Sequence, residues 1–237
     1  MQNMILDLYG PDTSTDAIQA LREEAAQVLG DAGGSWTREA VQNLKLIDSA
    51  IREAMRITPF ACIGLPRTVV HPDGITIETP GGKLHIPRGT ALAAPLEGVH
   101  HDEDIYPEPH RYKPFRFGDS ANLRNISGLN SGAAGAAEKT TRRSGSQKAK
   151  SSVTLDDGFL SFGIGKHACP GRFFAVNEMK LFVAHMLLNY DVECLNRRPE
   201  PRTLGWLRLP YNDGRIRVRK RGAGLEGENE TACTGRT

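Results

Sequence analysis

The stretch FLSFGIGKHACPGRFFA, residues 159–175, passes from a glycine-rich loop straight into an apolar run and carries Cys169 between Gly165 and Gly171. Glycine permits backbone shapes that other residues avoid, and it lets a flat partner approach closely. Pro170 suits the first position of a helix, where its missing N–H costs nothing. The stretch therefore predicts a stiff loop that presents Cys169 at the N-terminus of a helix.

The position of Cys169 favours an ionised thiol, because the positive end of a helix dipole stabilises thiolate over thiol. A thiolate acts as a nucleophile or as a metal ligand. A nucleophile needs a base, and His167, two residues away, is poorly placed to serve as one. A single thiolate on a glycine loop is typical of the axial ligand of haem iron. A cysteine nucleophile and an inert cysteine on a helix-capping loop are the alternatives.

The composition is that of a globular protein and excludes several other classes. The 237 residues are 39% hydrophobic and 24% charged, with a formal net charge of +2, so no nucleic-acid partner is expected. The four cysteines include no CxxC pair, which argues against a structural zinc site. No apolar run approaches the ~20 residues that cross a bilayer, and MQNMILDLYG, residues 1–10, does not show the basic start and long apolar centre that are expected of a signal peptide. We expect the chain as given to be soluble.

Hydrophobic periodicity predicts a fold that is mainly α with small β-sheets, an α+β fold. The expected helices are residues 14–29, with Ser14 or Thr15 as N-cap, 37–57, with Thr37 as N-cap, and 172–190. The last is apolar almost all round and hence expected to be buried, and the expected strands are 75–78 and 84–86. Four segments follow from the pattern: 1–117 with the first helices and strands, 118–157 as a low-complexity flexible insertion, 158–221 with the cysteine loop, the buried helix and the last strands, and 222–237 as a disordered tail.

The segment FGIGKHACPGRFFA, residues 162–175, resembles the haem-binding loop of cytochrome P450, the haem-thiolate monooxygenases, and of their fungal members in particular. Chance produces its pattern of Phe, Gly and Cys in roughly 1 of 10^4 chains of this composition. The resemblance implies haem b as cofactor, with Cys169 as the axial ligand of its iron. It also places other residues of the loop against the haem: Phe162, Gly163, Gly165, His167 and Gly171.

Further motifs carry the same resemblance in the family's order. Glu53-Ala54-Met55-Arg56 is similar to the family's ExxR, and PFRF, which contains Arg116, follows it. The resemblance implies that Glu53, Arg56 and Arg116 form a buried structural triad. By periodicity alone, Glu53 and Arg56 make an exposed ion pair one helical turn apart. The usual acidic second position of the PFRF motif is Phe115 here.

The resemblance also implies roles at more variable positions. Arg67 matches a position that pairs with a haem propionate, and His167 stands where most relatives have the arginine that does so. Phe60, Ala61 and Ile63 would line the substrate pocket. A surface arginine at position 67, and simple core packing at positions 60 and 63, are the alternatives.

The resemblance covers about the C-terminal half of a family member, the haem-binding half of the fold. The family's oxygen-activating A/G-G-x-D/E-T motif lies upstream of the stretch that Met1 begins, so we expect no catalytic residue in this chain. The similar AGGSWT, residues 32–37, has Trp36 where the threonine belongs. Full-length relatives would be anchored to the endoplasmic reticulum membrane.

The implied function is monooxygenation: insertion of one oxygen atom from O2 into a C–H bond or alkene of an apolar small molecule. Electrons would come from NADPH through NADPH–cytochrome P450 reductase, with Lys166 and Arg172 either at the docking face or as solvated charges. Family likeness suggests fungal secondary metabolism. The alternative is a truncated, non-catalytic remnant that at most binds haem or a partner.

Overall fold

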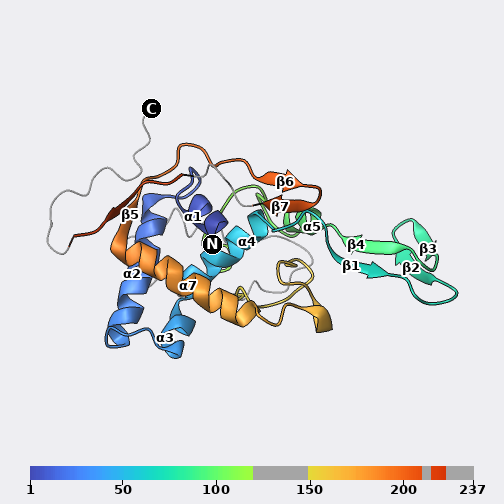
Figure 1. Ribbon diagram of the computed structural model, residues 1–237, viewed down its shortest axis with the longest axis horizontal. Helices are drawn as coiled ribbons and strands as arrows, with labels where there is room; N and C mark the ends of the chain where they lie inside the picture. The colour runs from blue at the N-terminus through green and yellow to red at the C-terminus, as the bar shows by residue number, and fades with distance from the viewer. Residues whose placement is uncertain (120–148, 210–214, 223–237) are drawn as a thin grey trace.

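A computed structural model describes residues 1–119, 149–209 and 215–222. Its helices gather in one lobe, from which an arm of paired strands extends (Figure 1). The helices are α1 (Gln2–Leu8), α2 (Thr15–Asp31), α3 (Arg38–Asn43), α4 (Lys45–Ile57), α5 (Leu96–His100), the 3-10 helix η2 (Gly165–His167) and α7 (Arg172–Asn189). The strands are β1 (Gly64–Thr68), β2 (Ile75–Thr79), β3 (Gly82–Ile86), β4 (Ala91–Ala94), β5 (Tyr190–Val192), β6 (Arg202–Leu204), β7 (Leu207–Leu209) and β8 (Val218–Lys220).

The strands described form two-stranded antiparallel sheets, β1 with β4, β2 with β3, β5 with β8 and β6 with β7. This arrangement of helices and small sheets confirms the predicted fold class. The β2–β3 hairpin pairs Ile75 with Ile86 and Ile77 with Leu84, as the alternating pattern predicts. Of these four side chains, only Ile86 is buried.

Helix α2 begins as predicted and ends two residues later than predicted. The Ser14 side chain accepts a hydrogen bond from the Ala17 N–H at 3.2 Å and caps the helix. Gly30 remains helical, and the left-handed residues that end the helix are Gly33 (φ 68°) and Gly34 (φ 80°).

The single helix predicted over residues 37–57 is two helices, because Leu44 leaves the helical conformation with ψ at 80°. Thr37 caps α3 as predicted, accepting from the Ala40 N–H at 3.1 Å. No side chain of its own caps α4. Instead, the Glu24 carboxylate of α2 accepts from the backbone N–H groups of residues 45, 46 and 47 at 2.7–2.9 Å. The sequence suggested one continuous helix, but α4 starts anew at residue 45, where a side chain from α2 caps its first N–H groups.

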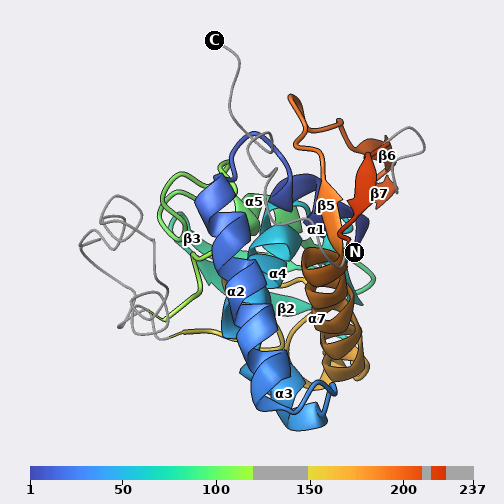
Figure 2. The same cartoon turned by 90° about the vertical axis from the view of Figure 1, so that its left-hand side faces the viewer.

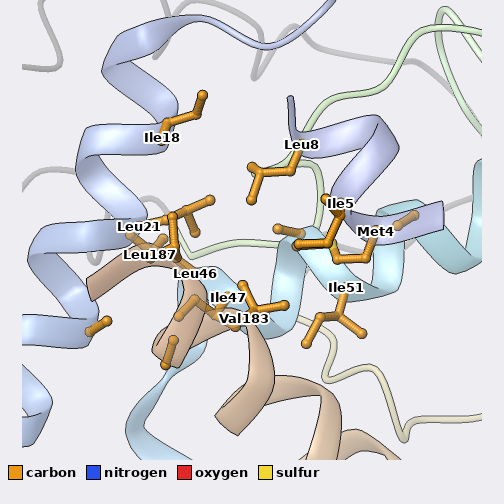
Figure 3. Close-up of a cluster of buried hydrophobic side chains, with 14 of the residues drawn as sticks. Met4, Ile5, Leu8, Ile18, Leu21, Leu46, Ile47, Ile51, Val183 and Leu187 are labelled. Carbon is orange, nitrogen blue, oxygen red and sulfur yellow. The ribbon is translucent and has the colours of Figure 1, made fainter. Parts of the chain in front are cut away.

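The hydrophobic core lies where α1, α2, α4 and α7 meet, and α2 and α7 run side by side (Figure 2). Arg22 of α2 ties the two helices together by donating to the Leu187 carbonyl at 2.9 Å. Figure 3 shows the apolar side chains that converge from these helices: Met4, Ile5, Leu8, Ile18, Leu21, Leu46, Ile47, Ile51, Val183 and Leu187.

The prediction that α7 is buried all round is wrong. Val183, Ala184 and Leu187 are fully buried on the face toward α2 and α4, but Phe174 is 75% exposed and Phe173 54% exposed. A uniformly apolar helix can bury only the face that neighbouring elements cover, and here the other face meets solvent. No helix within the described ranges is long and apolar enough to cross a membrane.

Most of the predicted insertion, and all of the predicted tail except Gly222, lie outside the described residues. The described end of the insertion, residues 149–157, differs from the prediction because it packs on α4. Ser152 is fully buried there, and Asp48 of α4 accepts from its N–H at 2.9 Å.

Candidate functional site

The loop around Cys169 is built by backbone hydrogen bonds and two left-handed glycines. The Cys169 N–H donates to the Phe162 carbonyl at 2.8 Å, and the Ala168 N–H donates to the Gly165 carbonyl at 3.1 Å. Gly163 and Gly165 have φ values of 76° and 63°, a region that side chains with a Cβ rarely adopt. The Cys169 thiol is free and exposed.

Pro170 does not occupy the first helical position that we predicted. Gly171 is the N-cap of α7 and Arg172 its first residue, so Pro170 lies one residue before the cap. No side-chain cap and no acidic residue in the first turn neutralise the N–H groups at this end of α7. Cys169, three residues before Arg172, therefore remains next to the positive end of the helix dipole.

Glu53, Arg56 and Arg116 meet in one hydrogen-bonded network. Glu53 and Arg56 are both fully buried, and the carboxylate receives Arg56 Nε at 2.8 Å and Nη2 at 2.9 Å. Arg116 Nε donates to Glu53 Oε1 at 2.9 Å, across 63 residues of sequence. Lys113 adds its backbone N–H to the same oxygen at 3.1 Å. The exposed pair suggested by periodicity is therefore not what forms.

The same face of α4 carries polar residues that the sequence analysis missed. Arg52 donates to the carbonyls of Ser151 and Thr154 at 2.7 and 2.8 Å, and to Asp156 Oδ2 at 2.8 Å. Its guanidinium also lies 3.8 Å from the centre of the Phe159 ring. Because Asp48, Arg52 and Arg56 follow one another at intervals of four, their spacing was the signal that could have revealed this face.

Helix α4 also binds two other segments by hydrogen bonds: the PFRF segment and the start of the cysteine loop. Ser49 Oγ donates to the Pro114 carbonyl at 2.8 Å and fixes the PFRF segment. Ser161 Oγ donates to the Met55 carbonyl at 3.1 Å and fixes the start of the cysteine loop.

His167 and Lys166 are both exposed on the 3-10 helix η2, next to Cys169 in sequence. Arg67 is exposed on β1, where its Nη1 donates to the Pro66 carbonyl at 2.7 Å. The strand reaches the loop through Leu65, since a Cβ added to Gly163 would lie 3.4 Å from Leu65 Cδ2. Leu65 itself has a φ of 56°, a costly conformation for a leucine, and the sequence gives no signal of it.

The predicted pocket residues lie against a second segment that the sequence analysis did not assign to the site. Ala61 pairs with Leu207, and the Cys62 N–H donates to the Trp206 carbonyl at 2.8 Å. Ala61 is buried by this pairing, whereas Phe60 and Trp206 are 59% and 62% exposed. The segment with Phe60 and the segment with Trp206 thus lie side by side, and each exposes a large apolar side chain.

A pocket of about 280 Å³ lies elsewhere, beside the C-terminal end of α4, and its lining does not include Phe60, Ala61 or Ile63. Its lining is largely polar and includes Asp7, Glu97, His101, Arg198 and Arg208. Asp7 pairs with Arg198 and Glu97 with Arg208. Burial raises the pKa of Asp7 to about 6, although Arg198 acts in the opposite direction.

The residues of the cysteine loop fit a flat, iron-containing group. The thiol of Cys169 is exposed, and a Cβ added to Gly171 would lie 3.9 Å from Cys169 Sγ, so this glycine leaves the flank of the sulfur open. Gly165 has no atom within 4 Å of the Cβ position, which also leaves space for a partner.

Comparison with known proteins gives a consistent family. A family model described as Cytochrome P450 matches residues 13–215. The chain is 42% identical over 223 residues to the cytochrome P450 monooxygenase okaG of Penicillium ochrochloron, which covers 93% of this chain and 41% of that protein. It is 36% identical over 225 residues to the cytochrome P450 monooxygenase gloP of Glarea lozoyensis, covering 93% and 39%, and 39% identical over 226 residues to fsoD of Humicola fuscoatra, covering 94% and 38%. The chain thus spans about two fifths of the length of these relatives.

Proposed function

The chain belongs to the cytochrome P450 family, and we propose that it is the haem-binding part of a fungal haem-thiolate monooxygenase. The observation that carries the proposal is the exposed free thiol of Cys169, on a glycine loop at the uncapped N-terminus of α7. A thiolate in this setting is a ligand for haem iron rather than half of a nucleophile–base pair.

In the proposed site, each residue of the loop has a defined task. Cys169 would supply the thiolate that binds the iron, and its backbone N–H donates to the Phe162 carbonyl, which holds this part of the loop in place. Gly165 leaves open the space that a side chain would fill, and Gly171 places no Cβ beside the sulfur of Cys169. When bound, haem b supplies the iron chemistry that activates O2 for insertion of one oxygen atom into a C–H bond or alkene.

An exposed arginine and an exposed histidine support the binding of an anionic cofactor edge. Arg67 and His167 carry no acidic partner in the contacts that the described residues make, so both are open to a propionate. Histidine, in place of the arginine that is more usual in the family, can donate a ring N–H to a propionate oxygen.

The substrate class follows from the apolar side chains at the strand pair beyond α4. Phe60 and Ile63 are exposed next to the segment that carries Trp206 and Leu207. Such a wall favours an apolar small molecule, as proposed from the family. Electrons are proposed to come from NADPH through NADPH–cytochrome P450 reductase, with Lys166 and Arg172 at the docking face, and the pathway to belong to secondary metabolism.

The second candidate is a family member that binds haem or a partner without turnover. The wide exposure of Phe173 and Phe174, in the first turn after Cys169, favours this reading for the chain by itself. An apolar face open to water leaves a bound cofactor poorly shielded.

The experiment that tests the proposal is a reduced, carbon monoxide difference spectrum of the purified chain loaded with haem. We expect a Soret band at the red-shifted position of thiolate ligation. Cys169→Ala should abolish it, and Cys62→Ala, which removes the half-buried free thiol, should keep it. A thiolate band that survives in Cys169→Ala would refute the ligand assignment. Absence of any band in the unaltered chain would refute haem binding by the chain and leave only the partner-binding form of the second candidate.

A further inference from the structure

His100, at the end of α5, connects the buried network of α4 to the cysteine loop. Its side chain is fully buried, and its Nε2 accepts from the Leu160 N–H at 2.8 Å. Its backbone carbonyl accepts from Arg56 Nη1 at 2.6 Å. The imidazole stacks on Phe159, with ring centres 5.6 Å apart and planes inclined by 19°. One residue thus contacts both the ExxR arginine and the first residues of the loop.

Further backbone hydrogen bonds continue from Leu160 to Cys169. The Leu160 carbonyl accepts from the Gly163 N–H at 2.9 Å and closes the first turn of the loop. Within that turn, the Phe162 carbonyl accepts from the Cys169 N–H at 2.8 Å. The position of the cysteine backbone therefore depends on how Leu160 is held, and the group that holds its N–H is His100 Nε2.

The hydrogen bond defines the state of the imidazole. Nε2 can accept from an N–H only through its free lone pair, so the ring is neutral and its proton is on Nδ1. Burial, together with the neighbouring charges of Arg56, His101 and Arg52, lowers the pKa of His100 to about 4. Among the described residues, Nδ1 of His100 is buried without a hydrogen-bond partner.

We infer that His100 is a positioning residue for the cysteine loop, transmitting the placement of Arg56 to Cys169 through the Leu160 N–H. The feature that matters is a buried neutral acceptor at this point, and not the bulk or aromatic character of the ring. The inference rests on the proposed haem site for its functional meaning. The connection from His100 to Cys169, however, lies within the chain and can be measured without haem.

Two substitutions separate the acceptor from the ring. His100→Phe keeps a planar ring to stack on Phe159 and removes the acceptor. His100→Gln removes the ring and can place an amide oxygen near the position of Nε2. The neighbouring His101 gives a matched control, because its Nε2 lies 3.2 Å from the Ile57 carbonyl and does not bond the loop.

The experiment is hydrogen–deuterium exchange of the 237-residue chain without haem. In His100→Phe, we expect the amides of Leu160, Gly163 and Cys169 to exchange about tenfold faster or more, because a buried N–H loses its acceptor. Amides of α2 serve as the internal reference for global stability and should be unchanged. His100→Gln and His101→Phe should both exchange as the unaltered chain does.

Three outcomes would overturn the inference: unchanged loop exchange in His100→Phe, equally fast loop exchange in His100→Gln, or the same effect in His101→Phe. If His100→Phe exchanges fast in α2 as well, the chain has unfolded as a whole and His100→Gln decides. Protected loop amides in that variant support the inference, and fast ones overturn it.

A spectroscopic readout then connects the coupling to the site. In the haem-loaded chain, His100→Phe should lower the share of the thiolate-type carbon monoxide band, and His100→Gln should restore it. An unaltered chain that binds no haem refutes the proposed function and leaves the exchange result standing.

Discussion

Replacing Arg116 with methionine tests whether the buried network of α4 stabilises the fold. The guanidinium donates to Glu53 Oε1 at 2.9 Å and to the carbonyls of Pro107, Glu108 and Arg111 at 2.7–3.2 Å. Its side chain is only 8% exposed. Methionine preserves much of the volume and removes all of these donors.

The expected loss follows from what remains after the substitution. Breaking a buried ion pair by removing one partner costs about 3–5 kcal/mol. Glu53 keeps its two hydrogen bonds from Arg56, so its charge is still paired, and we expect the lower end, about 3 kcal/mol. Glu53→Gln should cost more, because Arg56 and Arg116 then both lose their carboxylate.

The assay is urea denaturation followed by circular dichroism, with Arg111→Met as the matched control. Arg111 is in the same loop, but its side chain is 60% exposed and its partner Glu108 is 54% exposed, so its removal should be nearly neutral. Equal losses for Arg116→Met and Arg111→Met would refute the reasoning, because burial would then have no bearing on the cost.

Three further substitutions test other contacts. Glu24→Gln should lower the melting temperature by the equivalent of about 1 kcal/mol, since the amide nitrogen of glutamine cannot accept the hydrogen bond from the N–H of residue 47 that caps α4, and Glu23→Gln is the control. Equal melting of the two variants would contradict this. Burial raises the pKa of Asp7 to about 6, so the contribution of Asp7 to stability is present below pH 3.8, its usual pKa, and is lost as pH rises through 6. Asp7→Asn should therefore make the melting temperature depend less on pH between about pH 4 and pH 7. An unchanged dependence of the melting temperature on pH would count against this. Arg52→Met should release residues 149–157 to faster proteolysis, because the carbonyls of that segment lose their donor, and an unchanged cleavage rate would show that other contacts hold it.

Features that depend on neighbouring residues could be read from the sequence. Ser14 and Thr37 cap their helices where the pattern predicts. The hairpin of β2 and β3 has the predicted alternation. Gly163 and Gly165 adopt left-handed backbone angles in a tight loop before Cys169, as that residue type favours. In each case the partners lie within a few residues, so the local order of side chains is sufficient.

Other features depend on partners far along the chain. The break at Leu44 depends on Glu24, about twenty residues earlier, and the predicted continuous helix missed it for that reason. The polar face of α4 is buried because Arg116 and Asp156, 63 and 104 residues away from their partners, fold against it. Periodicity alone assigned that face to solvent.

The sequence by itself determined the β2–β3 turn, the local caps at Ser14 and Thr37, and the left-handed glycines of the cysteine loop, because a residue's own backbone preferences act over short distances. Only the tertiary structure decided which faces of the helices are covered. The apolar surface of α7 is partly exposed, and the charged face of α4 with Arg52, Glu53 and Arg56 is buried, against the usual expectation for each. Burial depends on what the rest of the chain places against a helix, and the helix's own sequence does not contain that information.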